Sequence, residues 1–387
     1  MFLALRELRF ARGRFALMGL VIALIAVLMV MLSGLSAGLV NDGVSGLKAM
    51  PVTAFAFDEG TKQDNAFSRS IVEREQVDAW RKHPQVAAAE PMGVSIVNAE
   101  TDDGEQVDLT LFGVKPESFL APEVSSGEGL AQPAGIVVSE TAQDQGLDLG
   151  SVVTLDRIGT ELEVVGFTDG QATFGHVDVA YVPLGTWQLI AAGQSPDGGR
   201  PSADQVAAVD FDQASVVALQ AVDGTALASG DAQVLTAGDT EASTTTMLLQ
   251  ESFNASPGYQ AETLTLSMIQ WFLYAIGALV VGAFFTVWTI QRGQELAVLR
   301  AMGASVRYLL GDALAQAALL LVTFTLAGLA AGIALGALMP AGMPFSLEAG
   351  SIAVASAVTI VLGLLGATVA VLRVTRIEPL TALGGNR

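Results

Sequence analysis

The chain has 387 residues, of which 51% are hydrophobic and 15% are charged. Average soluble domains contain about 25% charged residues, so this composition indicates that a large part of the chain lies in a membrane. The absence of cysteine excludes disulfides, cysteine-ligated zinc and iron–sulfur clusters.

Charge is unevenly distributed along the chain. Residues 41–270 carry 34 acidic and 9 basic side chains, a net charge of −25, whereas the remaining residues carry 5 acidic and 10 basic ones, a net charge of +5. This asymmetry predicts that the two parts of the chain lie in different environments.

The N-terminal region begins with a basic segment at residues 1–14, followed by an uncharged apolar stretch at residues 15–40. This stretch is too long for a signal peptide and lacks an A-x-A-like cleavage site. About 20 apolar residues suffice to cross the hydrocarbon core, so we interpret it as transmembrane helix 1.

Residues 41–265 have the pattern of a folded domain, with short apolar alternations broken by Gly, Asp and Pro. The segment Glu73–Lys82 predicts a helix with Val77 and Trp80 on one side. Residues 135–167 predict a strand, a short helix, a glycine turn, a strand, a hairpin and a final strand. We therefore expect a mixed α/β domain.

The C-terminal third contains three more apolar segments of membrane-spanning length, with Asp312 as the single charge inside them. The sequence thus predicts an α-helical membrane protein with four transmembrane helices and one large α/β extracellular domain inserted between helices 1 and 2. The remaining segments are transmembrane helix 2 (266–290), a cytoplasmic coupling helix (291–308), transmembrane helix 3 (309–338), an extracellular loop (339–351), transmembrane helix 4 (352–372) and a cytoplasmic tail (373–387).

Arginines predict the orientation in the membrane. They gather in three short segments that flank the predicted spans, and such segments are usually cytoplasmic. We therefore expect a multi-pass protein with both termini in the cytoplasm and the large domain outside.

Nucleotide binding through a P-loop requires a glycine directly before a lysine, and none of the four lysines follows a glycine. The chain is therefore not expected to be an enzyme by itself, and ATP hydrolysis would come from a separate subunit. The amphipathic segment 291–308 is a candidate docking helix for such a partner, although it is equally compatible with a simple interfacial turn. Its candidate coupling residues are Glu295, Leu296, Leu299, Arg300 and Met302.

The segment RGQELAVLRAMGAS and the ending RVTRIEPLTALGG resemble the two cytoplasmic signatures of the FtsX-like (MacB-type) permease family. The stretch GIVVSETAQDQGLDLGSVVTL resembles that family's extracytoplasmic core domain. Four further passages are similar to haem-efflux permeases of the HrtB type: LSGLSAGLVNDGVSGLKAMP, GYQAETLTL, FFTVWTIQRGQ and MPAGMPFSL.

This resemblance implies an ABC-type efflux permease in the plasma membrane of a bacterium. It implies a homodimer surrounded by membrane lipid and bound to two copies of a cytosolic ATPase, which binds the ATP. Haem would be the transported ligand, extruded for detoxification, with no intrinsic cofactor and no metal beyond ligated haem iron. A basic patch with aromatics is missing outside the membrane, which argues against nucleic acid.

Haem iron is usually bound by His, Met, Cys or Tyr, beside a hydrophobic slot for the porphyrin. The candidates near the outer half of the membrane are Met29, Met31, Met50, Tyr259, Glu262, Met268 and Trp271, with Phe272 and Tyr274 as further aromatic lining. Each has an ordinary alternative: methionines fill packing gaps, Tyr and Trp anchor helices at the interface, and Glu262 begins a helix. His83 and His176 are predicted to be surface or structural residues, because the resemblance places the ligand at the membrane helices.

Two other functions fit the same sequence. A mechanotransmission permease would use ATP to move the external domain, acting on a peptide, a lipid or a wall hydrolase. A membrane-anchored sensor or binding protein without transport would not need the cytoplasmic signatures, so they disfavour it.

Overall fold

The computed structural model describes residues 12–196, 198–209, 213–291, 298, 302–340 and 343–375. The chain separates into two compact units, residues 1–39 with 263–387 and residues 40–262. We call the first the helical unit and the second the sheet unit. The candidate coupling residues Glu295, Leu296, Leu299 and Arg300 lie outside the described residues.

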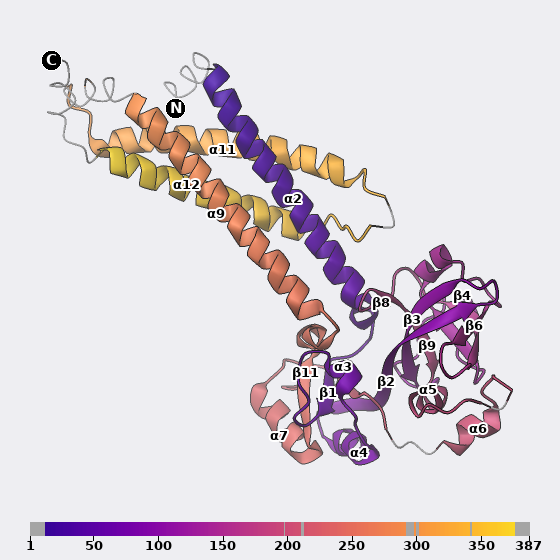
Figure 1. Cartoon of the computed structure of the whole chain (residues 1–387). Coiled ribbons are helices and arrows are strands. Elements are labelled where there is room, and N and C mark those ends of the chain that lie inside the picture. The colour runs from indigo at the N-terminus through magenta and orange to yellow at the C-terminus, as the bar shows by residue number, and fades with distance from the viewer. Residues whose placement is uncertain are drawn as a thin grey trace. The chain divides into compact units, whose positions relative to one another are not determined.

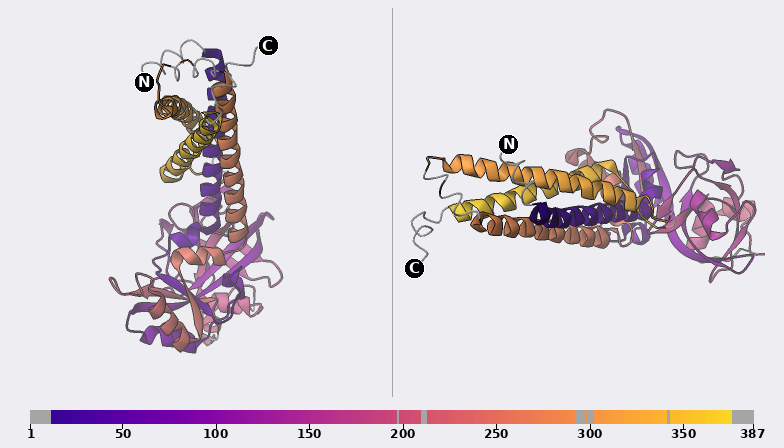
Figure 2. Two further views of the ribbon diagram at one scale, coloured as in Figure 1. Left: turned by 90° about the vertical axis from the view of Figure 1, so that its left-hand side faces the viewer. Right: turned by 90° about the horizontal axis from the view of Figure 1, so that it is seen from above.

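Among the described residues, four helices are long and apolar enough to cross a membrane. They are α2 (Arg12–Lys48), α9 (Tyr259–Gln291), α11 (Val306–Gly336) and α12 (Ala349–Thr375). They form two pairs that cross at an angle (Figure 1 and Figure 2): α2 runs beside α9, and α11 runs beside α12. The helix α2 continues past Val40, where the sequence predicted the end of the first span, and it loses helical geometry at Val44 (φ −146°).

Small residues allow these helices to approach closely. On α11, a Cβ atom added to Gly328 would lie 2.3 Å from the carbonyl oxygen of Ala23 on α2. On α12, a Cβ atom added to Gly366 would lie 2.4 Å from the carbonyl oxygen of Ala278 on α9. Without an aqueous hydrophobic effect between helices, such close packing is what holds a membrane bundle together.

One face of α9 is buried in the bundle. Its buried residues recur three or four positions apart, which places them on a single stripe of the helix. They are Tyr274, Gly277, Val281, Phe285 and Thr289.

The sheet unit is built on a mostly antiparallel sheet with the order β11-β1-β10-β2-β3-β9-β5-β7-β4, and β6 and β8 pair at its side. The strands are β1 (Ala54–Asp58), β2 (Val86–Thr101), β3 (Gln106–Val114), β4 (Ser126–Gly127), β5 (Gly135–Val138), β6 (Val152–Leu155), β7 (Glu161–Phe167), β8 (Thr173–Phe174), β9 (Val177–Pro183), β10 (Val216–Ala221) and β11 (Thr244–Leu248). The shorter helices are α3 (Ala66–Arg69), α4 (Arg74–Lys82), η1 (Glu140–Gln145), α5 (Leu184–Ala191), α6 (Ala203–Ala208), α7 (Ala232–Ala242), α8 (Leu249–Ser252) and η2 (Phe253–Ala255).

The long strand β2 joins two lobes of the sheet unit. Its first part pairs with β10 and its second part pairs with β3. Between the lobes lies an aromatic core, in which the Phe67 ring makes edge contacts with Phe55, Phe57 and Phe174 at centroid distances of 5.0–5.3 Å. All four rings are buried.

Two local predictions for this unit are confirmed. The helix α4 spans Arg74–Lys82 and buries Val77 and Trp80. The stretch 135–167 forms β5, the short helix η1, a glycine turn and the paired strands β6 and β7. The turn uses Gly146 and Gly150, both at φ +86°, a conformation that glycine adopts without steric cost.

Candidate functional site

A histidine joins two carboxylates in the sheet unit. The Nδ1 atom of His176 lies 2.8 Å from Oδ2 of Asp42, and its Nε2 atom lies 3.0 Å from Oε2 of Glu262. Asp42 lies on α2 and Glu262 on the first turn of α9. We call these three residues the histidine cluster.

His176 sits in the two-residue turn between β8 and β9, where Phe174 pairs with Val177. Gly175 and His176 both have positive φ, 63° and 65°. Hairpin turns of this kind favour Gly and Asn. A non-glycine residue in this region costs about 1–3 kcal/mol, which the surrounding contacts must offset. The two carboxylates provide such contacts for His176.

The turn also docks on the end of α2 through backbone and hydroxyl groups. The amide of Gly175 donates to the carbonyl of Gly43 at 2.9 Å, and the hydroxyls of Ser45 and Thr173 lie 2.7 Å apart. Directly between these contacts, Val44 leaves helical geometry. Hydrogen bonds to the turn therefore hold the end of α2 at the point where its helical geometry is interrupted.

The environment of His176 favours its charged form. Burial alone lowers the pKa of the imidazole, but hydrogen bonds to Asp42 and Glu262 and the negative charge of both carboxylates outweigh this effect and raise the pKa above its usual value. The side chains are 29% (His176), 22% (Asp42) and 36% (Glu262) exposed, so water and salt screen the cluster only partly.

This geometry does not suit metal binding. The two carboxylates lie against opposite nitrogens of the ring, so they do not converge with one nitrogen on a single ion. Among the described residues, no group of three His, Asp or Glu side chains is arranged to hold a metal. The cluster instead has the chemistry of a proton-dependent ion pair.

Two of the predicted site residues lie at this place. Glu262 is part of the histidine cluster, and Tyr259, one turn earlier on α9, packs its ring 6.1 Å from that of Phe253. The sequence predicts a surface or structural role for His176 and gives no sign that it contacts Glu262. The Gly-His turn was the available signal, but residues 42, 176 and 262 meet only through the fold.

Further along α9, three predicted residues present apolar surface. Met268 is 52% exposed, and Trp271 and Phe272 are each 64% exposed. The Trp271 ring makes an edge contact with Tyr274 at 5.8 Å. The first part of α9, residues 259–272, thus carries oxygen donors, a thioether and exposed aromatic rings on one helix; we call it the α9 head.

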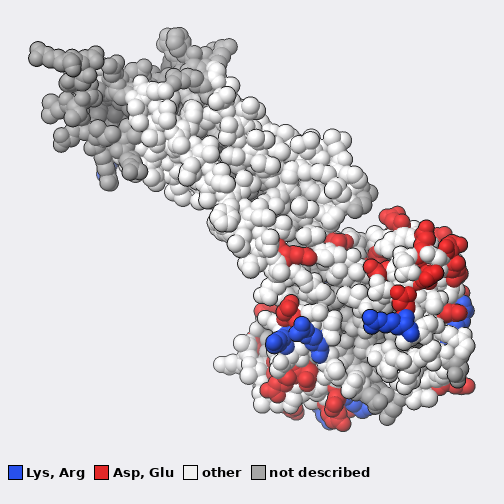
Figure 3. All heavy atoms as spheres, in the orientation of Figure 1, with Lys and Arg blue, Asp and Glu red and all other residues white. Residues whose placement is uncertain are grey.

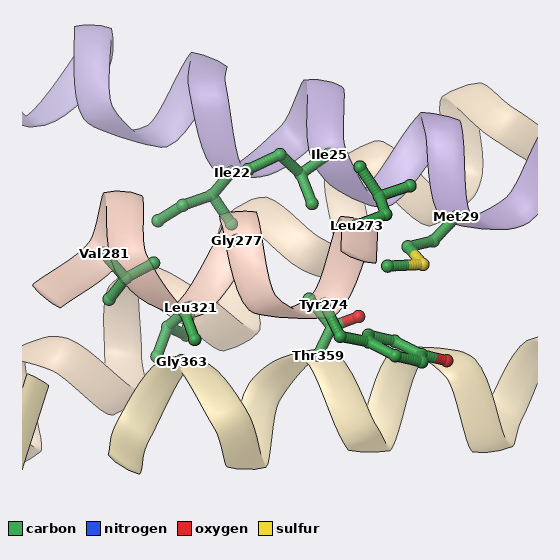
Figure 4. A pocket seen from close by; sticks show the side chains of 11 residues that line it. Ile22, Ile25, Met29, Leu273, Tyr274, Gly277, Val281, Leu321, Thr359 and Gly363 are labelled. Carbon is green, nitrogen blue, oxygen red and sulfur yellow. The ribbon is translucent and has the colours of Figure 1, made fainter. Parts of the chain in front are cut away.

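A second candidate place is a small pocket within the helical unit (Figure 4). Met29 from α2 and Tyr274 from α9 both line it, and both are buried. Its cavity of about 10 Å³ is about the size of one water molecule. The other lining residues are Ile22, Ile25, Leu273, Gly277, Ala278, Val281, Leu321, Thr359 and Gly363.

The remaining predicted residues are dispersed. Met31 is half-buried on α2. Met50 is 5% exposed and belongs to the core of the sheet unit. Of the coupling residues, Met302 is described and is 71% exposed.

Two family models together cover most of the chain. Residues 15–237 match the MacB-like periplasmic core domain, and residues 267–379 match the FtsX-like permease C-terminal domain. The chain belongs to the FtsX-like, MacB-type permease family. Family membership and the four apolar helices make it a multi-pass membrane protein with an extracellular domain, here the sheet unit.

Curated relatives of this permease match over its full length. A Staphylococcus epidermidis protein named as a hemin transport system permease, HrtB, is 24% identical over 387 residues, which is 100% of this chain and 99% of that one. An uncharacterized ABC transporter permease of Mycobacterium tuberculosis is 21% identical over 389 residues, with the same coverage. The chain is thus an ABC transporter permease, a kind of subunit that works with an ATPase.

Among solved structures, the periplasmic region of MacB from Actinobacillus actinomycetemcomitans matches with a TM-score of 0.36 at 11% identity. The match covers 52% of this chain and 91% of that one.

Proposed function

We propose that this permease exports haem from the membrane, and that haem binds along the α9 head. The observation that carries the proposal is the donor set on this one helix. Tyr259 and Glu262 supply oxygen donors on one side of the helix, and Met268 supplies a thioether about two turns later on the opposite side. A phenolate and a thioether are both known ligands of haem iron.

The apolar porphyrin face needs a matching surface. Trp271 and Phe272 follow Met268 on α9 and are largely exposed. Flat aromatic rings stack well on a large conjugated macrocycle. Names of relatives point the same way, since a full-length relative is named as a hemin transport permease.

The cavity among the helices argues for a lateral site. Sites for drug-sized ligands have volumes of about 300–1,000 Å³, whereas the pocket lined by Met29 and Tyr274 measures about 10 Å³. In this conformation a porphyrin would bind on the helix surface and enter from the lipid. Met29 and Met31 would take part only after the helices move, and Met50 only if the core of the sheet unit opened.

We also propose that the permease works as a homodimer in contact with membrane lipid. The helix α2 supports this with a stripe of leucines spaced three to seven residues apart that no described part of the chain covers. These residues, which are 41–69% exposed, are Leu17, Leu20, Leu24, Leu28 and Leu35. A second copy of α2 would bury such a stripe by knobs-into-holes packing.

The ATPase is proposed to dock on the cytoplasmic segment 291–308, with both termini on the same side of the membrane. The charge pattern of the arginines supports this orientation. Met302, largely exposed, is available to a partner. Replacing Leu299 by Glu should abolish copurification with the ATPase, whereas Leu149→Glu, the same change at an exposed position of the sheet unit, should not.

Titration of the purified full chain with haemin tests the haem site. We expect a saturable shift of the Soret band, weakened more than tenfold by the combination Tyr259→Phe and Glu262→Ala because the iron loses both oxygen donors. Met268→Leu should cause a smaller loss of affinity, since Met268 lies on the other side of α9 from the two oxygen donors and the new side chain keeps its volume.

Matched controls distinguish ligation from general damage. His83→Gln, Tyr308→Phe and Met343→Leu change the same residue types elsewhere and should leave the titration unchanged; Tyr308 and Met343 are exposed. A titration without saturation, or one that is identical in the Tyr259 and Glu262 variants, would rule out this site.

A mechanotransmission role is the second candidate. It is favoured by the same small cavity, because a protein that only transmits movement needs no passage between its helices. In that case haemin would not bind saturably, while ATP hydrolysis by the partner would still move the sheet unit.

A further inference from the structure

The histidine cluster has a feature that the proposed transport function does not use. Both ring nitrogens of His176 face carboxylates, at 2.8 and 3.0 Å. A neutral imidazole donates from one nitrogen and accepts at the other, whereas an imidazolium donates from both. Both hydrogen bonds can therefore form at once with two ionised carboxylates only when the ring is protonated.

The partners of His176 come from the ends of two long helices. Asp42 lies near the end of α2, two residues before the interruption at Val44, and Glu262 lies in the first turn of α9. The turn that carries His176 is short and is fixed to β9 by the pair Phe174 and Val177. The ring thus ties both helix ends to one short hairpin of the sheet unit.

We propose that His176 is a protonation-dependent latch that holds the ends of α2 and α9 together and releases one of them when the ring loses its proton. His176 is a positioning residue in this account, since it acts through the helices. The latch does not depend on which cargo the permease carries.

The groups around the ring favour the closed latch, because they stabilise the protonated form of His176. The titratable groups around the ring are Asp42 from α2 and Glu262 and Tyr259 from α9. Asp178, two residues further along the chain on β9, interacts electrostatically with Asp42. Asp178 is turned to other partners, accepting hydrogen bonds from Thr141 and Gln145. The two facing carboxylates raise the pKa of the ring despite its partial burial, so opening requires a higher pH than the deprotonation of an ordinary histidine.

Two substitutions of Glu262 are predicted to have opposite effects on the latch: Glu262→Gln should keep it closed, and Glu262→Ala should open it. The Gln amide donates a hydrogen bond, so it pairs with the bare Nε2 of a neutral ring while Nδ1–H still donates to Asp42. In E262Q the latch should therefore stay closed at alkaline pH. In E262A it should be open at every pH, because Nε2 has no partner on α9.

The native chain has no cysteine, so a spin-label pair can be introduced without background. Labels at Asp169, just before the hairpin, and Ala261 on α9 are both at exposed positions. In the full chain in lipid nanodiscs, we expect a narrow distance distribution at about pH 5.5 that broadens and lengthens by about pH 9, the range in which histidine titrates. The distance distribution of E262Q should remain narrow at both pH values, and that of H176Q should not change with pH.

Histidine ring NMR provides a second readout that a purely structural role would not produce. The chain has two histidines, so H83Q leaves a single signal to follow in the full chain. We expect its titration midpoint to coincide with the change in distance and to fall in E262A. A wild-type distance that is constant over this pH range, or that changes equally in E262Q, would overturn the latch, whatever haemin does.

Discussion

The sheet unit and the helical unit bury apolar surface in opposite ways. Among the described residues of the sheet unit, the exposed large hydrophobic side chains are Ile71, Ile96, Leu149 and Val222. The helical unit exposes large apolar side chains along each of its four helices. The charged side chains follow the reverse pattern: on the face that Figure 3 shows, acidic side chains form several patches on the sheet unit, whereas the described helical surface is almost free of charge. Each surface matches a different solvent, water for one and lipid for the other.

The interiors differ as well. Large rings interlock in the sheet unit, where Phe67 contacts three other phenylalanines. In the helical unit, glycines such as Gly328 let backbones touch. The first interior is therefore most sensitive to the loss of volume, and the second to its addition.

The largest effect is expected from Phe67→Ala, which empties the centre of the aromatic core. Truncating a buried Phe costs about 3–5 kcal/mol, so the sheet unit should unfold at a much lower urea concentration. With Trp271 and Trp288 replaced by Phe, the fluorescence of Trp80 and Trp187 reports this unit alone. Ile71→Ala is the exposed control, and an equal loss in both variants would contradict the account of the core.

The next effect concerns the helical unit. Gly328→Leu places a side chain where a Cβ atom already meets Ala23 at 2.3 Å, whereas Gly311→Leu, on the same helix, meets nothing within 4 Å. Overpacking costs about 1–3 kcal/mol, so the first variant should lower the thermal midpoint in detergent and the second should not. Equal midpoints would show that α2 and α11 do not pack as described.

A smaller effect is expected from pH. The folded-state pKa of His176 lies above its usual value, so its contribution to stability is fully present below about pH 6.5 and is lost as the pH rises through the folded pKa. The urea midpoint of the wild type should therefore fall more than that of His176→Gln between about pH 6 and about pH 9. If the urea midpoints of the wild type and of His176→Gln fall by the same amount, His176 does not have the electrostatic role described above.

The smallest change in monomer stability is expected from Leu24→Ala on the exposed stripe of α2. Surface substitutions usually stay within about 0.5 kcal/mol, but this one should lower the dimer fraction in nanodiscs if α2 meets a second copy. Leu326→Ala, also exposed on α11, is the matched control. A dimer fraction that falls equally in both variants would place the contact elsewhere.

Local features of the fold followed from the sequence, but the cluster did not. The periodicity around Val77 and Trp80 and the glycines at 146 and 150 determine structure within a few residues, so they could be predicted. Asp42, His176 and Glu262 are separated by 134 and 86 residues, and only the sheet topology brings the turn to the two helices. The residues of the α9 head could be predicted to lie on one helix. Which of their side chains are exposed could not be predicted, because this depends on how the other helices pack against α9.

The most direct test of the central claim is ATP-dependent haem transfer. The permease and its copurifying ATPase would be reconstituted in haemin-loaded vesicles, with apomyoglobin as the acceptor outside. We predict that ATP accelerates transfer by the wild type and that the combined Tyr259→Phe and Glu262→Ala variant loses this acceleration while retaining ATP hydrolysis. Transfer at the same rate with and without ATP, or unaffected by the two substitutions, would contradict haem export through the α9 head.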